Sequence, residues 1–313
     1  MPDKEALLRN LNERTFNPMN DVAFKFIFGS EERKSITIGF LDDILCDRLE
    51  HHIKDITYRN SELPPLTEDG KLSRLDVRCR LDTDEEVDVE MQVINYHTMQ
   101  RRTLFYWARM FIDSLGQGLD YIELKPSITI NILAFDLLPQ ADPLAMYTVM
   151  NPKTGEELSK DLTLFFIEIP KYARQPKKPV SQLSRMERWM AYFANQLDDK
   201  ERTELAMSDT AINNAMDAAK TFLSNDDDRL KYLNRQMAIM DYNSAIRGAR
   251  EDGFSDGEAS GITIGETRGK MRGMKQLSQL MEILLTSGKN DDSIRVAKDE
   301  VYRDKLLREY HIN

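Results

Sequence analysis

The sequence predicts an α/β core, in which helices flank a mixed sheet, followed by an all-helical C-terminal region. Three observations indicate this class. Apolar and polar residues alternate over residues 75–93 on either side of an acidic turn, which is typical of two paired strands. Two later apolar runs, residues 126–135 and 162–169, are typical of central strands. From residue 180 onward, apolar residues recur at helical spacing.

Length and composition limit the size and the surroundings of the protein. The 313 residues allow about two domains. No apolar run reaches the length of a membrane span, and the N-terminal residues lack the apolar segment of a secretion signal, so we expect a cytoplasmic protein without a membrane partner. Cys46 and Cys79 have no metal-binding spacing, so no zinc site is expected. The net charge of −10 argues against a protein that coats nucleic acid non-specifically, because such binding depends on many lysines and arginines.

The first predicted helix follows Asn20, whose side chain is a typical helix cap. Its buried side is defined by three apolar residues at helical spacing, Phe24, Ile27 and Phe28. Asp21 and Lys25 share another face of this helix. They could form a solvent-facing ion pair, or the helix could offer one of them to a metal ion or a phosphate.

The hairpin of residues 75–93 has one apolar face and one polar face, because successive side chains of a strand point to opposite sides. A turn at residues 82–85 would bring Asp76 level with Glu90 and Gln92, within one residue of register. Two carboxylates and an amide would then lie within reach of one ion. The alternative is that this face is the solvated side of a half-buried antiparallel pair.

This set of side chains suits the hydrolysis of a phosphodiester. A hard cation such as Mg²⁺ takes oxygen ligands, accepts one or two protein carboxylates and keeps other positions for water and phosphate. Asp76, Glu90 and the backbone carbonyl of Met91 are the expected ligands of Mg²⁺ or another divalent cation. The bound ion would lower the pKa of a water molecule and stabilise charge on the phosphate oxygens. Gln92 would orient the water or the phosphate.

A helix rich in aromatic residues is predicted over residues 97–116, directly after the polar strand. Arg102 and Tyr106 share one face of it, and a helix at this point is well placed to aim them at a bound phosphate. Packing of Tyr106 in the core is the alternative. The basic segment of residues 171–178 is a further candidate for contact with DNA, although a solvated loop is the favoured interpretation.

The chain divides into four predicted parts. Residues 1–179 form the core, which also holds a helix over residues 32–46, a strand over residues 53–59 and a connector marked by proline and glycine over residues 138–155. Residues 180–247 form a helical extension with helices at residues 182–196, 200–223 and 227–248. Residues 248–274 form a glycine-repeat helix or linker, and residues 275–313 end the chain with helices at residues 276–285 and 292–310.

Glycine recurs at every fourth residue from Gly253 to Gly273, the one internal repeat of the sequence. Six glycines inside a helix cost about 5 kcal/mol relative to alanine. The glycine stripe turns by about 40° per step around a helix, so a straight partner touches only about three of them. We expect a helix that packs closely against a partner chain or an earlier helix, rather than a flexible linker, because a linker needs no strict period. We also expect a homo-oligomer that forms through the C-terminal helices.

Four landmarks in this order resemble one nuclease family. They are NDVAFKFIFG at residues 20–29, LDVRCRLDTDEEVDVEMQ at residues 75–92, RRTLFYWARMF at residues 101–111, and the regularly spaced glycines. The chain resembles the recombination-promoting nuclease and transposase family of the PD-(D/E)xK nuclease superfamily over nearly its whole length. The resemblance implies a restriction-endonuclease-like fold, metal-dependent endonuclease activity on DNA, and a link to recombination and mobile elements.

One residue departs from the pattern of the wider superfamily, which has a lysine where this chain has Gln92. The resembled branch commonly carries glutamine there. Lys25, Arg101 or Arg102 could supply the missing positive charge beside the phosphate. The alternative is a catalytically degenerate protein of the same fold that binds DNA or forms oligomers without cutting.

Overall fold

The computed structural model describes residues 10–63, 73–116 and 118–312. The chain divides into two compact units, residues 1–240 and 241–313, which are described separately here. Among the helices of the described residues, none is both long enough and apolar enough to cross a membrane.

The first unit is built on a six-stranded sheet with the order β1-β4-β5-β6-β8-β7. The strands are β1 (Ile56–Tyr58), β4 (Val77–Leu81), β5 (Glu86–Gln92), β6 (Ser127–Leu133), β7 (Leu144–Tyr147) and β8 (Leu162–Glu168). β5, β6 and β8 are parallel, whereas β1, β4 and β7 pair antiparallel with their neighbours. Two short strands, β2 (Glu62–Leu63) and β3 (Ser73–Arg74), form a separate pair. The predicted mixed sheet is confirmed.

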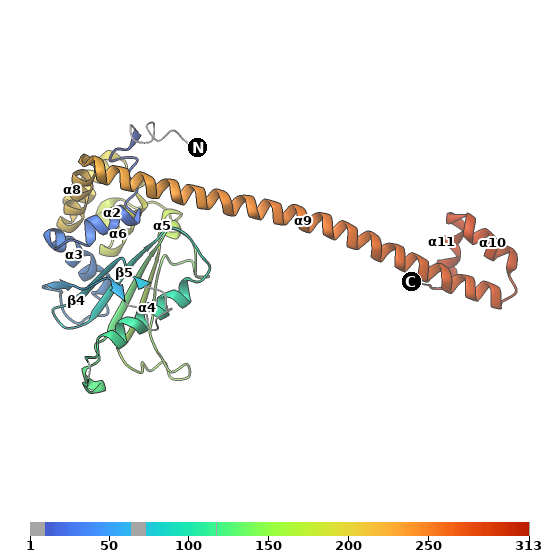
Figure 1. Cartoon of the computed structure of the whole chain (residues 1–313), viewed down its shortest axis with the longest axis horizontal. Coiled ribbons are helices and arrows are strands. Elements are labelled where there is room, and N and C mark those ends of the chain that lie inside the picture. Colours follow the sequence, from blue (N-terminus) through green and yellow to red (C-terminus); the bar gives the residue numbers. More distant parts are fainter. Residues whose placement is uncertain (1–9, 64–72, 117, 313) are drawn as a thin grey trace. The chain divides into compact units, whose positions relative to one another are not determined.

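Helices cover both faces of this sheet (Figure 1). The apolar face of β5 and β6 shares one hydrophobic core with α2 (Asp21–Phe28), α3 (Lys34–Leu45) and α6 (Arg185–Ala194). An aromatic cluster joins these helices, with ring contacts among Phe28, Phe40, Trp189 and Phe193. The other face is covered by α4 (Met99–Asp113), where the Thr103 hydroxyl donates to Asn131 of β6 at 3.0 Å. β5 is therefore buried on both sides.

Short helical segments connect these elements. They are the 3-10 turns η1 (Glu31–Arg33), η2 (Tyr121–Glu123) and η3 (Val180–Gln182), and the helix α5 (Ile169–Ala173). The predicted connector over residues 138–155 contains a strand that the sequence analysis does not single out, β7. β7 is an edge strand with exposed side chains at Met146 and Tyr147, which weakens the alternation that would reveal a strand.

Two predicted helices are wrong, because each is divided by an aspartate. α7 (Asp199–Ser208) and α8 (Thr210–Ser224) replace the single helix expected over residues 200–223, and Asp209 between them accepts hydrogen bonds from two backbone amides at the start of α8. In the same way, α10 (Asn290–Lys298) and α11 (Glu300–Glu309) replace the helix expected over residues 292–310, and Asp299 caps α11. A capping side chain satisfies the first amides of a new helix, so the chain can change direction.

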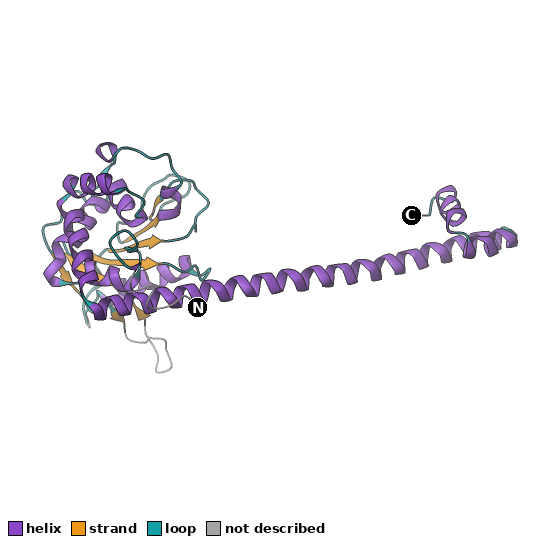
Figure 2. Cartoon of the chain, turned by 90° about the horizontal axis from the view of Figure 1, so that it is seen from above, coloured by secondary structure: helices purple, strands orange, loops and turns teal. Residues whose placement is uncertain are grey.

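α9 (Asp226–Thr286) is one continuous helix of 61 residues, whereas the sequence predicts three separate segments there (Figure 2). Its first turns belong to the first unit, since Tyr232 and Leu233 lie in the main core. The glycine repeat is helical. In the second unit, the end of α9 packs with α10 and α11 around a small apolar cluster of Leu280, Leu284, Val296 and Leu306.

Candidate active site

Asp76 and Glu90 face each other at the end of the β4–β5 hairpin. Val77 pairs with Val89, so Asp76 lies opposite Glu90 in the register that the sequence predicts. The Asp76 amide donates to Glu90 Oε1 at 3.1 Å, and the Met91 amide donates to Asp76 Oδ2 at 2.9 Å. Each carboxylate is thus held by a backbone amide of the opposite strand.

Two cations from different helices bind this pair. Lys25 Nζ of α2 lies 2.9 Å from Asp76 Oδ1, and Arg102 Nη2 of α4 lies 3.0 Å from Glu90 Oε2. The Lys25 side chain is 46% exposed and that of Asp76 is 12% exposed, whereas Glu90 is fully buried. Solvent therefore reaches the carboxylate pair from the side of Asp76 and Lys25.

Gln92 connects Glu90 to Arg102. Its amide nitrogen donates to Glu90 Oε2 at 2.8 Å, and its amide oxygen accepts from Arg102 Nη1 at 3.0 Å. Arg102 Nε donates in turn to the Tyr106 hydroxyl at 3.0 Å, and the guanidinium lies 5.0 Å from the centre of the Tyr106 ring. The predicted residues Glu90, Gln92, Arg102 and Tyr106 thus form one hydrogen-bonded chain.

The pKa of Glu90 is raised to about 8, chiefly by burial and then by the neighbouring carboxylate of Asp76. The positive charges of Arg102 and Lys25 act in the opposite direction and lower the pKa of Glu90. A buried carboxyl group beside a second carboxylate keeps its proton near neutral pH, because two negative charges at short distance repel each other. Strongly shifted carboxyl groups of this kind are typical of functional sites.

Asp88 is a site residue that the sequence analysis does not single out. It lies on the same side of β5 as Glu90, it is fully buried, and neither of its carboxylate oxygens has a hydrogen-bond partner among the described residues. Burial raises its pKa, and the charges of Glu90 and Asp76 add to this effect. The alternation of β5 places Asp88 beside Glu90, so the signal was present in the sequence.

The interpretation of this strand face as a solvated surface is wrong. Glu86, Asp88 and Glu90 are at most 1% exposed, because α4 covers them. Glu86 is neutralised there by Arg78 Nε at 3.4 Å and Arg80 Nη2 at 2.6 Å. Charged groups buried in this way need partners, and arginines of the neighbouring strand supply them.

Asp21 and Arg101 lie apart from this cluster. Asp21 binds Arg235 of α9 at 2.8 Å, whereas Lys25 binds Asp76, so the local ion pair between Asp21 and Lys25 is not formed. Arg101 is exposed on the first turn of α4 and makes no hydrogen bond or ion pair with any other residue that the structure describes. The structure thus joins Lys25, but not Asp21 or Arg101, to the carboxylate pair.

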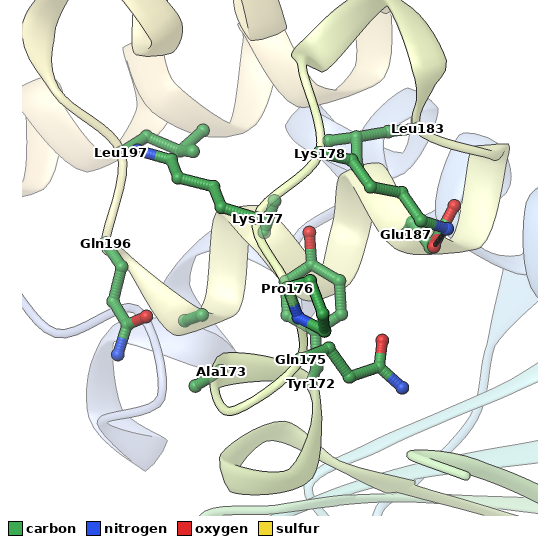
Figure 3. Close-up of a pocket in the computed structure, with 12 residues that line it drawn as sticks. Tyr172, Ala173, Gln175, Pro176, Lys177, Lys178, Leu183, Glu187, Gln196 and Leu197 are labelled. Carbon is green, nitrogen blue, oxygen red and sulfur yellow. Dashed lines mark hydrogen bonds and ion pairs between the residues drawn. The ribbon is translucent and has the colours of Figure 1, made fainter.

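The basic segment of residues 171–178 has its charges neutralised. Lys171 is buried against Glu168 at 2.6 Å, Arg174 binds Asp136 at 2.7 Å, and the two remaining lysines bind Glu201 and Glu187. Figure 3 shows Lys177 and Lys178 beside a pocket of about 100 Å³ between this segment and α6, which apolar groups largely line. Paired cations of this kind do not form a free phosphate-binding surface.

The donor atoms at the hairpin suit a hard divalent cation. No group of three or more His, Cys, Asp or Glu side chains that could hold a metal occurs among residues 10–63, 73–116 and 118–312. Two carboxylates and one carbonyl nevertheless fit Mg²⁺, which keeps several water ligands. The Met91 amide points toward the Asp76 side of β5, and the Met91 carbonyl points the same way because both groups of a strand residue face one neighbour. The Lys25 ammonium already occupies a cation position at Asp76.

Comparison with known proteins identifies the family. A sequence model described as PD-(D/E)XK nuclease family transposase matches residues 18–249, which include α2, the hairpin and α4. No curated protein and no solved structure was found to match the chain. The family match covers most of the sequence and supports a nuclease- or transposase-like role. The chain therefore belongs to the PD-(D/E)XK nuclease family transposases.

Proposed function

We propose that this protein is a metal-dependent DNA endonuclease that hydrolyses phosphodiester bonds in recombination or in the movement of mobile elements. The observation that carries the proposal is the Asp76–Glu90 pair, which backbone amides fix across the hairpin and which Lys25 and Arg102 contact. Buried paired carboxylates with nearby cations suit phosphoryl chemistry better than a purely structural role, because their charges are costly to bury.

Asp76, Glu90 and the Met91 carbonyl would hold Mg²⁺ or another divalent cation. When bound, this ion supplies a water of lowered pKa and positive charge for the phosphate oxygens. Glu90 must give up its proton to become a ligand, because only the carboxylate binds a hard cation. Asp76 must release Lys25 from Oδ1, and the exposed side chain of Lys25 has room to move.

Lys25 and Arg102 would replace the lysine that the wider superfamily has at the position of Gln92. The released Lys25 ammonium would contact the scissile phosphate from α2. Arg102 would contact a phosphate oxygen from α4, held in place by Gln92 and Tyr106. Cations held beside a phosphate stabilise the negative charge that develops on its oxygens. Arg101, exposed on the same helix, would add a contact to the DNA backbone.

Gln92 would act by positioning its neighbours. Both polar atoms of its amide are engaged, one with Glu90 and one with Arg102, so it couples the metal ligand to the phosphate-binding group. Orientation of the attacking water, the other role considered for Gln92, would use the second N–H of the amide or the second lone pair of its oxygen.

The proposal is tested by cleavage of supercoiled plasmid with the full-length protein and Mg²⁺ or Mn²⁺. Asp76→Asn and Glu90→Gln each replace a carboxyl group that could bind the cation by an amide of nearly the same shape, and we expect each to lower cleavage by at least roughly a hundredfold. Asp21→Asn is the matched control, since this carboxylate binds Arg235 instead, and it should cut like the unsubstituted protein. Equal cleavage by all variants would show that the activity arises elsewhere.

A catalytically degenerate DNA-binding protein is the second candidate, and Gln92 in place of lysine is the observation that favours it. Binding of labelled duplex DNA without cleavage in any divalent cation, and with equal affinity for the Asp76→Asn variant, would establish this function instead.

A further inference from the structure

One face of α9, between Glu251 and Lys275, has no partner in the described part of the chain. Every residue from 251 to 275 is exposed, including the apolar side chains of Phe254, Ile262 and Met271. Apart from the adjacent residues and the backbone of its own helical turns, a β-carbon added at any glycine of the repeat would meet no atom of the described residues within 4 Å. The helix therefore carries the cost of its glycines without any packing against the described residues that would explain them.

The charges of this segment are divided between its two halves. Residues 251–262 contain four acidic and no basic side chains, and residues 264–275 contain four basic and one acidic. Within a single helix this order is unfavourable, because Asp252 and Asp256, like Arg268 and Arg272, are like charges four residues apart. None of these four side chains forms an ion pair with another described residue. The pattern thus indicates a partner outside the chain.

The charge pattern and the glycine repeat share one centre, Thr263. If a second copy of the segment is reversed about this residue, Glu258 falls opposite Arg268 and Glu251 opposite Lys275. The glycines then also fall opposite one another, the innermost pair being Gly261 and Gly265. No acidic residue of the segment falls opposite another acidic residue in this register. A charge pattern and a small-residue pattern with the same centre of reversal are what a two-fold antiparallel contact requires.

Helix geometry places the central glycines and the pairing charged residues on one face of α9. At about 100° per residue, Gly261 and Gly265 lie about 20° on either side of a line that passes opposite Thr263. Glu258 and Arg268 lie within about 40° of that line, and Glu251 and Lys275 within about 60°. Phe254 lies on the line itself. Glycines at the centre let two backbones approach closely, while longer side chains pair at the flanks.

We propose that α9 binds the α9 helix of a second copy of this chain, antiparallel and centred on Thr263. A parallel pair in register would set each acidic residue beside its own copy, which is repulsive. A staggered parallel pair would leave one acidic half and one basic half without a partner, and such a contact would continue into filaments. The antiparallel arrangement alone matches both halves and closes as a dimer.

The test is sedimentation of the full-length protein at about 0.15 M salt, where charges more than about 8 Å apart are largely screened. We expect a dimer. Glu258→Arg and Arg268→Glu should each raise its Kd by roughly tenfold, because each creates two like-charge contacts per dimer. The double variant should restore the original Kd to within about threefold, since exchanged charges still pair in an antiparallel dimer. In a parallel dimer the exchange would restore nothing.

Two matched controls separate contact from general effects on the helix. Asp256→Arg makes the same change of charge on the far side of the helix and should leave the dimer Kd within about threefold. Gly261→Leu and Gly248→Leu both raise helix propensity, but only Gly261 lies in the proposed contact, so only Gly261→Leu should weaken the dimer. A monomer at all concentrations up to about 100 µM, well above the Kd of a specific complex, or a double variant as weak as the single ones, would overturn the proposal.

Discussion

The raised pKa of Glu90 predicts that binding of a divalent cation depends strongly on pH. With a pKa of about 8, Glu90 is mostly protonated at pH 7 and mostly ionised at pH 9. The cation needs the carboxylate, so a proton competes with it below the pKa. The apparent affinity for Mg²⁺ should therefore rise with pH, by about tenfold from pH 7 to pH 9 and by about a further tenfold from pH 6 to pH 7.

Calorimetric titration of the full-length protein with Mg²⁺ measures this effect directly. Titrations in two buffers that differ in ionisation enthalpy count the protons released, and we expect about one per bound ion at pH 6 and nearly none at pH 9. Arg102→Met should move the rise in affinity to higher pH, because the positive charge of Arg102 lowers the pKa of Glu90. Glu90→Gln should remove the dependence. An affinity that is constant from pH 6 to pH 8 would refute the assignment of Glu90 as a buried ligand.

Three further predictions concern other parts of the chain. Lys25→Met should lower plasmid cleavage by roughly a hundredfold, because it removes a phosphate contact. It should change Mg²⁺ binding much less, because it frees Asp76 but also raises the pKa of Glu90, and these effects oppose each other. Equal losses of cleavage and of Mg²⁺ binding would contradict this prediction. A thiol reagent should label Cys46 in the native protein but Cys79 only after unfolding, since Cys79 is fully buried and burial raises the pKa of its thiol. Asp209→Ala should lower the free energy of unfolding of the first unit by about 1 kcal/mol in urea titrations, through loss of the α8 cap.

The hairpin could be predicted because residues close together in the sequence determine its two faces and its register. The alternation of Val77, Val87 and Val89 with charged residues fixes which side chains share a face, and the length of the turn fixes the register. The alternation does not predict whether another element packs on the polar face of the hairpin. In the structure α4 packs there. The pattern of β5 is typical of a half-solvated strand, but β5 is buried on both sides and Asp88 is shielded from solvent.

Contacts between distant residues could not be predicted in the same way. Asp21 and Lys25 are four residues apart and suggest a local pair, yet each binds a residue brought by another element, Arg235 and Asp76 respectively. These two ion pairs join residues that are far apart in the sequence, and they depend on the packing of α2 between the sheet and the start of α9. By contrast, the breaks at Asp209 and Asp299 were local signals, since an aspartate before a helical pattern is a typical cap.

The structure also gives a physical reason for glutamine at position 92. Arg102 is held by an acceptor at Gln92 and by the Glu90 carboxylate, so the position beside Glu90 needs an oxygen that can accept a hydrogen bond. A lysine there would offer no acceptor and would place a second positive charge against the Arg102 guanidinium. The glutamine and the arginine are therefore matched, and the positive charges that contact Asp76 and Glu90 come from α2 and α4. Gln92 is therefore compatible with the proposed active site, because Lys25 and Arg102 bring positive charge to the carboxylate pair from helices instead of from the strand.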